Sequence, residues 1–143
     1  MKNIILFVWQ LPQAILGFFL FLYFLIANKI VKSEEHKIIE SCWIEGIYHV
    51  PVIGTNFGVS LGVFIFYTID NPLIMEHELG HVPDSRFFGW LYLVLIGLPG
   101  TIWRIIAEID LRAGRCADWY WNVPSEMRAH TRAGIKPGDI SLK

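Results

Sequence analysis

Met75-Glu76-His77-Glu78-Leu79-Gly80-His81 lies near the middle of the 143-residue chain and contains the pattern H-E-x-x-H. On a helix, residues four positions apart share one face, so His77 and His81 can direct their imidazoles at one metal ion. Glu78 follows the first histidine directly, and its carboxylate can reach a water at that ion without being a ligand. The stretch therefore predicts a metal site with two histidine ligands and Glu78 as the catalytic base.

The residues around this stretch predict a short helix over residues 72–82. Asn71 is suited to the N-cap, and Pro72 is suited to the first helical position. Val82 precedes Pro83, and the residue before a proline is disfavoured in the α region, so we expect the helix to end or kink there. The alternative interpretation is a helix on which two ordinary histidines fall at this spacing by chance.

The composition indicates a membrane protein. Hydrophobic residues make up 54% of the chain, charged residues make up 17%, and the mean hydropathy is +0.45. A typical soluble domain is roughly 45–50% apolar and about 25% charged. The net charge of −1 gives no basis for binding nucleic acid. Residues 34–86 have a net charge of −6, as expected of a section that holds a cation.

The first of two apolar segments covers residues 4–27. About 20 helical residues span the hydrocarbon core of a bilayer, so this segment is long enough to cross it. It is interrupted near its start by Gln10, Pro12 and Gln13. We expect a retained transmembrane helix rather than a cleaved signal peptide, because the apolar run is too long and no cleavage site follows. The protein is accordingly expected to be an integral protein of a bacterial cell membrane.

The second apolar segment covers residues 87–106 and contains Gly97-Leu98-Pro99-Gly100. Glycine and proline interrupt helices, so we expect either a kinked transmembrane helix or two shorter re-entrant segments. Basic and acidic side chains then alternate every four residues, at Arg104, Glu108 and Arg112. This spacing predicts a solvated or interfacial helix face.

Residues 38–69, between the first apolar segment and the motif helix, are rich in Val, Ile, Phe, Tyr and Thr. These residue types favour strands. We expect a β-hairpin or a small sheet, with a turn at Gly54-Thr55-Asn56 and a second strand over residues 59–68. The expected fold is a single α+β membrane domain over residues 1–143.

A second helix is expected over residues 124–133, because Pro124 is suited to its first position and Gly134 lies beyond its end. It carries Glu126, an acid in an apolar and aromatic neighbourhood. Catalytic zinc sites keep three protein ligands and an open position for water, and Glu126 is the best candidate for the third ligand. His130 shares a helix face with Glu126 and is either the partner of a ligand histidine or the ligand itself.

Together, His77, His81 and Glu126 resemble the gluzincin pattern of zinc metallopeptidases, in which H-E-x-x-H is followed by a glutamate on a later helix. The chain is also similar to small, membrane-embedded, zincin-like proteins that have a strand, an H-E-x-G-H helix, an apolar segment and a glutamate helix in this order. The resemblance covers the two helices only. It departs from the pattern at His130, where the family often has an aspartate. Site-2-type intramembrane proteases share H-E-x-x-H, but their later L-D-G aspartate has no clear counterpart here.

The resemblance implies a Zn²⁺ cofactor and hydrolysis of peptide bonds. Glu78 would act as the general base, and Tyr120, Arg128 or His130 would stabilise the oxyanion. The implied substrate is a peptide or a membrane protein at the bilayer. The predicted hairpin either aligns this substrate by strand addition at its edge strand or has a purely structural role. The alternatives are a membrane protein with a structural or sensory metal site and a metal-free membrane adaptor. A further alternative is an oligomer in which a neighbouring copy shields the cleft.

Overall fold

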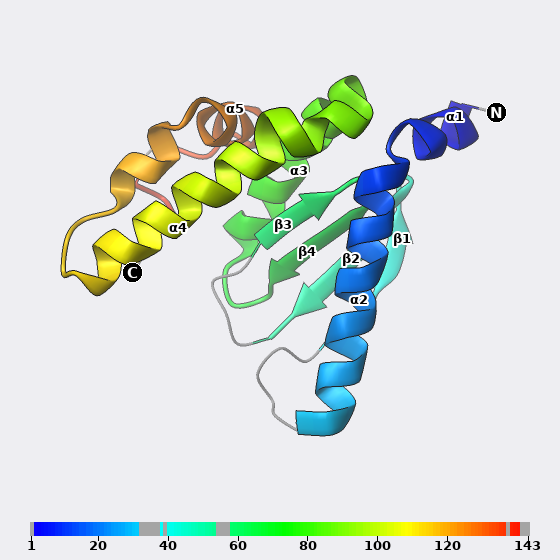
Figure 1. Ribbon diagram of the computed structural model, residues 1–143, viewed down its shortest axis with the longest axis horizontal. Helices are drawn as coiled ribbons and strands as arrows, with labels where there is room; N and C mark the ends of the chain where they lie inside the picture. The colour runs from blue at the N-terminus through cyan, green and yellow to red at the C-terminus, as the bar shows by residue number, and fades with distance from the viewer. Residues whose placement is uncertain (1, 32–37, 39, 54–57, 137, 141–143) are drawn as a thin grey trace.

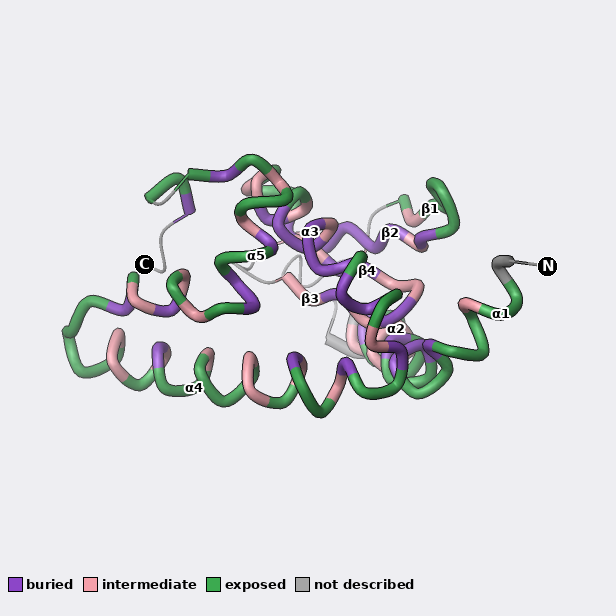
Figure 2. The backbone as a smooth tube through the Cα atoms, turned by 90° about the horizontal axis from the view of Figure 1, so that it is seen from above, coloured by how far each residue is buried: buried purple, intermediate pink, exposed green. Residues whose placement is uncertain are grey.

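A computed structural model of the chain describes residues 2–31, 38, 40–53, 58–136 and 138–140. These residues form a mixed α+β fold with five α-helices and a four-stranded sheet, which confirms the expected α+β class. Helices α2 and α4 lie on the same side of the molecule, and α3 lies on the other side of the sheet from α2 (Figures 1 and 2). The sheet is therefore covered on both faces.

The sheet contains two hairpins rather than one. Its strands are β1 (Cys42–Ile44), β2 (Ile47–Val52), β3 (Gly58–Leu61) and β4 (Phe64–Thr68), in the order β1-β2-β4-β3. Strands β1 and β2 pair antiparallel, as do β3 and β4, whereas β2 and β4 are parallel.

The expectation of one strand over residues 59–68 is wrong because the chain turns at Gly62. The φ angle of Gly62 is 64°, a left-handed value that glycine adopts without steric cost. Leu61 therefore pairs with Phe64 across a tight turn. The turn expected at residues 54–56 lies outside the described residues. The small sheet expected over this region is present.

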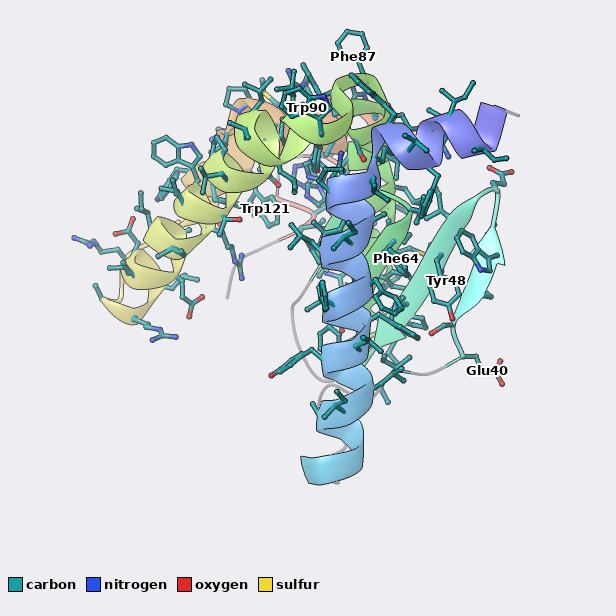
Figure 3. The ribbon with its side chains drawn as sticks, turned by 45° about the vertical axis from the view of Figure 1, so that its right-hand side comes forward. Glu40, Tyr48, Phe64, Phe87, Trp90 and Trp121 are labelled. Carbon is teal, nitrogen blue, oxygen red and sulfur yellow. The ribbon has the colours of Figure 1, made fainter. Side chains whose placement is uncertain are left out.

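Helix α2 (Leu11–Val31) covers one face of the sheet. Successive side chains of a strand point to opposite faces, so Val50 and Phe66 of the central strands share the face toward α2. Phe24 of α2 packs against both residues. Figure 3 shows Phe64 on the same face, where its ring stacks on Phe21 with a centroid separation of 6.5 Å.

Helix α3 (Pro72–Phe88) covers the opposite face, where Val82 packs against Ile65. Its beginning agrees with the sequence: the side chain of Asn71 accepts a hydrogen bond from the Leu73 N–H at 3.1 Å. The helix then continues through Pro83 to Phe88, so the expected end at residue 82 is wrong. A proline costs a helix one hydrogen bond, and here the surrounding turn is held by tertiary contacts that the local sequence does not reveal.

Two helices replace the single helix expected over residues 4–27. Helix α1 spans Lys2–Trp9, and α2 begins at Leu11. The break falls at Gln10 because Pro12 has no N–H to continue the helical hydrogen bonding, although its fixed φ suits the first turn of α2.

Polar side chains at this break connect it to the rest of the protein. Gln13 is fully buried, and its Oε1 accepts hydrogen bonds from the Gly62 N–H at 3.1 Å and from the Ser85 hydroxyl at 2.7 Å. Its amide donates to the Gly89 carbonyl, and Gln10 donates to Ser85 Oγ at 2.6 Å. The two glutamines of this apolar segment therefore form buried hydrogen bonds that connect the start of α2 to α3 and to the β3–β4 turn.

The second apolar segment bends before Gly97-Leu98-Pro99-Gly100, where the sequence predicted the break. Helix α3 is followed by a 3₁₀ turn (Gly89–Leu91), a π-helical turn (Leu93–Gly97) and helix α4 (Leu98–Arg112). Gly89 has a φ angle of 54°, and the indole of Trp9 lies where a Cβ would be. Pro99 does not break the chain, because it lies in the first turn of α4, where a missing N–H is tolerated.

Within the described residues, no individual helix is both long and apolar enough to cross a membrane. The helical stretches Pro72–Leu91 and Leu93–Arg112 satisfy that length and composition test only as a pair, with an angle of 114° between them.

Candidate metal centre

The candidate site lies where α5 (Pro124–Ala133) crosses α3. The bounds of α5 match those expected, and Gly134 ends it with a left-handed φ of 71°. At the crossing, a Cβ on Gly80 would lie 2.9 Å from both the carbonyl carbon and the Cα of Ala129. Only glycine permits this approach, which places Glu126, one turn before Ala129, beside the histidines of α3.

Two arginine contacts hold α5 in this position. Arg132 of α5 donates one hydrogen bond to the Gly80 carbonyl at 3.1 Å and another to the Asp84 carboxylate at 2.8 Å. Arg128 lies 3.5 Å from the other oxygen of Asp84. Asp84 is buried, so this ion-pair cluster ties the two helices together beside the histidines.

His77, His81 and Glu126 form a buried triangle of donor atoms. Nε2 of His77 lies 3.1 Å from Oε2 of Glu126, Nε2 of His81 lies 3.5 Å from the same oxygen, and the two nitrogens are 3.2 Å apart. Ligands held about 2.0–2.1 Å from a tetrahedral zinc ion are separated by roughly 3.3 Å. The group can therefore hold a metal ion without rearrangement of the helices.

The charges in this triangle are strongly coupled. Burial on its own would raise the pKa of Glu126, but its hydrogen bonds to His77 and His81 outweigh burial and hold the pKa well below its usual value. Burial likewise disfavours the imidazolium form of His81, yet the hydrogen bond to Glu126 and the neighbouring carboxylates raise the pKa of His81. A carboxylate that stays ionised beside two imidazoles is a donor set suited to a divalent cation.

Glu78 faces the same site from α3. It is only 5% exposed, and with the three candidate ligands it lines a cleft of about 640 Å³. Burial raises the pKa of Glu78 to about 6, although the nearby His81 and His77 act in the opposite direction. A carboxylate with a pKa near neutrality is matched to accepting and returning a proton.

The edge strand β3 approaches Glu78 closely. A Cβ on Gly58 would lie 2.5 Å from Oε1 of Glu78 and 2.6 Å from Cγ2 of Ile74, so a larger residue here would displace these two side chains. Residues Gly58 to Leu61 line the cleft, and among the strands that the structure describes, β3 pairs with β4 alone. The backbone of an edge strand therefore borders the site.

The structure separates the three residues expected to stabilise an oxyanion. Tyr120 lines the cleft, and burial together with the charge of Glu126 raises its pKa, which keeps the phenol protonated. Arg128 is exposed and directed toward Asp84, and it is not among the residues that line the cleft. Arg128 therefore lies outside the site formed by the described residues.

His130 packs beside a ligand instead of bonding to it. Its ring centroid lies 4.7 Å from that of His77, and it does not belong to the candidate ligand group among the described residues. Burial and the charge of His77 lower the pKa of His130 to about 4, so the ring is neutral near pH 7. The Nδ1 atoms of His77 and His81 have no hydrogen-bond partner among the described residues, so His130 does not orient His77 through a hydrogen bond.

Helix α4 contributes cleft residues that the sequence did not indicate. A Cβ on Gly100 would lie 3.6 Å from Oε1 of Glu126, and Arg104, one turn later, also lines the cleft. The repeat of charges after residue 100 predicted a solvated face. The one available signal was the four-residue spacing of Gly100 and Arg104, which places both on one side of a helix.

No protein-family model, curated protein sequence or solved structure matches this chain. The resemblance to gluzincins therefore rests on the motif and on Glu126.

Proposed function

We propose that the protein is a membrane-embedded zinc metallopeptidase that hydrolyses peptide bonds. The observation that carries the proposal is the buried triangle of His77, His81 and Glu126, with edges of 3.1, 3.2 and 3.5 Å, which fits a tetrahedral zinc ion. Glu78 faces the same cleft without belonging to the triangle. Two histidines and a glutamate with an adjacent carboxylate base form the donor set typical of hydrolytic zinc sites.

The residues of the chain have distinct roles in the proposed reaction. A bound zinc ion would supply Lewis acidity toward a water and the scissile carbonyl. Glu78 accepts the proton of the attacking water and returns it to the nitrogen of the leaving amine. Tyr120 remains protonated, with its hydroxyl bonded to Glu126, and it would donate to the carbonyl oxygen by exchanging that bond as negative charge develops there.

An extended peptide fits the cleft better than a compact substrate. Within the described residues β3 is the edge strand of the sheet, and strand addition at its outer edge would lay a peptide alongside Glu78. Gly58 keeps this approach free of side-chain atoms. The edge strand thus favours a peptide as the substrate.

The arrangement of ligands supports a catalytic metal site rather than a structural one. Structural zinc is usually closed by four protein ligands, often cysteines. The candidate group has three ligands among the described residues, and Cys42 and Cys116 are exposed. The donor triangle borders the cleft, which leaves a coordination position for water and substrate.

The apolar surface supports the membrane location. Many large apolar side chains are exposed on α1, α2 and α4, and α2 and α4 lie on the same side of the molecule (Figure 2). Phe87 and Trp90 at the bend before α4 are 77% and 53% exposed, and Figure 3 shows Phe87 projecting from the bend. Exposed apolar side chains in such number are suited to contact with lipid. If the bilayer covers it, the protein will stay with membranes in alkaline carbonate and leave them in detergent; release by carbonate alone would contradict this part of the proposal.

The proposed peptidase activity is tested by measuring metal binding and peptide hydrolysis separately. Protein purified without chelators should contain close to one zinc ion per chain by elemental analysis and should cleave peptides from a mixed library detected by mass spectrometry. Glu78→Gln should keep the metal and reduce hydrolysis by at least about 100-fold, the lower range for loss of a general base. The matched control is Glu76→Gln, an exposed glutamate on the same helix, which should behave as wild type. Full activity in the Glu78 variant would refute the mechanism.

A further inference from the structure

Arg104 of α4 lies in the cleft without a role in the proposed hydrolysis. Its side chain is half-buried, and its guanidinium carbon lies 5.8 Å from the centroid of the Tyr120 ring. Among the described residues that line the cleft, it is the single arginine or lysine. The cleft is otherwise mostly apolar, apart from the metal-binding residues and Glu78.

The guanidinium has no acidic partner within the described part of the chain. Glu108, one turn further along α4, lies 3.2 Å from Arg112, whereas no described carboxylate lies within ion-pair distance of Arg104. A charged group that is partly removed from water gains most from a charged hydrogen-bond partner. An anion entering the cleft would provide that partner.

The position of Arg104 relative to the metal centre sets where this anion would lie. Gly100 is adjacent to Glu126, and Arg104 follows it by one helical turn of about 5.4 Å. An extended peptide advances about 3.3 Å per residue, so the guanidinium is within reach of a group one or two residues from the scissile bond.

We infer that Arg104 is a specificity-determining residue that binds a substrate carboxylate one or two residues from the scissile bond. The inference rests on the proposed peptidase function and adds its substrate class: acidic peptides. The carboxylate has two sources, the side chain of an aspartate or glutamate and the free C-terminus of a peptide. Arginine binds either through paired N–H donors.

The test compares matched peptides cleaved by matched variants. One peptide pair differs by glutamate against glutamine beside the scissile bond, and a second pair differs by a free against an amidated C-terminus. Wild type should favour the charged member of at least one pair in kcat/KM by about tenfold, as expected for a charge-assisted hydrogen bond. Arg104→Gln should lose this preference, and Arg104→Lys should keep part of it. Arg112→Gln, at an exposed position on the same helix, is the control and should keep it fully.

A binding measurement separates this inference from the peptidase function. The same peptides are titrated into chelator-treated protein, and binding is followed by the fluorescence of tryptophan, since Trp121 lines the cleft. An Arg104-dependent preference for the charged peptide, in a protein whose zinc-loaded form cleaves none of the peptides, would support carboxylate binding by Arg104 and reject the peptidase. Cleavage with no charge preference would overturn the inference and leave the peptidase standing. If Arg104→Gln weakens binding to phosphatidylglycerol vesicles and leaves peptide preference unchanged, the anion is a lipid headgroup and the inference is wrong.

Discussion

Gly80 of α3 lies directly against the backbone of Ala129 of α5, and a Cβ on Gly80 would come within 2.9 Å of the Cα of Ala129. This contact belongs to the same helix crossing that brings Glu126 of α5 to 3.1 Å from His77 of α3. The second variable residue of H-E-x-x-H is therefore a packing determinant of the metal centre, although it supplies no ligand.

Gly80→Ala should push α5 away from α3 and displace Glu126 from the histidines. Forcing a methyl group into a filled contact typically costs about 1–3 kcal/mol. We expect the zinc affinity to fall at least tenfold and the free energy of unfolding to drop, measured by competition with a chromophoric chelator and by urea denaturation. Gly97→Ala is the control, because a Cβ there would meet its nearest described neighbours at an ordinary 3.6 Å. Unchanged affinity in Gly80→Ala would show that this contact does not position Glu126.

Asp84→Asn should weaken the connection between the same two helices by a different route. The substitution removes the charge that faces Arg132 at 2.8 Å and Arg128 at 3.5 Å. Asp84 is buried but both arginines are more than a third exposed, so we expect a loss of about 1–2 kcal/mol in the free energy of unfolding. Glu108→Gln, which breaks an exposed pair with Arg112, should cost less than about 0.5 kcal/mol in the same denaturation experiment. Equal losses in the two variants would contradict a special role for Asp84.

Local signals in the sequence predicted the elements that carry the chemistry. The cap at Asn71, the prolines at helix starts and the glycine after residue 133 placed α5 correctly and fixed the beginning of α3. Glu126 was predicted as the third ligand because catalytic zinc needs three protein ligands, because it is an acid on a second predicted helix in an apolar neighbourhood, and because the gluzincin pattern has a glutamate on a later helix. The helix boundaries depend on residues close together in sequence, whereas the contact of Glu126 with His77 joins residues 49 positions apart.

Features that depend on distant residues could not be predicted in this way. Pro83 continues a helix, and Gln10 and Gln13 interrupt an apolar segment because they bond to Ser85 and Gly89, more than 70 residues away. The parallel pairing of β2 with β4 likewise requires knowledge of where β3 folds back. Arg104 was assigned to a solvated face because its partner in the cleft, the ring of Tyr120, lies on a different segment of the chain.

Metal affinity should depend on pH through His81. A metal ion binds the neutral imidazole, so protons compete with it. Because the pKa of His81 is raised above its usual value of 6.5, competition should begin at a higher pH than for an ordinary histidine, and affinity should fall as the pH is lowered through that pKa. The pKa of Glu126 is lowered, so this carboxylate stays ionised over the same range. We expect Kd to rise about tenfold per pH unit for each proton displaced, measured by chelator competition. The control is His130→Gln, which should not change this pH dependence, because His130 is already neutral with a pKa of about 4. A zinc affinity independent of pH across this range would rule out histidine ligation.

Gly58→Ala should displace the catalytic base Glu78 without changing metal binding. The added methyl group would lie 2.5 Å from Oε1 of Glu78 and 2.6 Å from Cγ2 of Ile74, and would displace the Glu78 carboxylate together with Ile74 or the edge strand β3. Because Gly58 does not contribute to the donor triangle, zinc content should stay at the wild-type level while kcat falls by about 100-fold, the scale of a misplaced general base. Val59→Ala is the control at the neighbouring position, where a side chain is shortened and no new contact with Glu78 is made. A fall in zinc content that parallels the fall in kcat would mean that β3 supports the metal centre itself and not the orientation of Glu78.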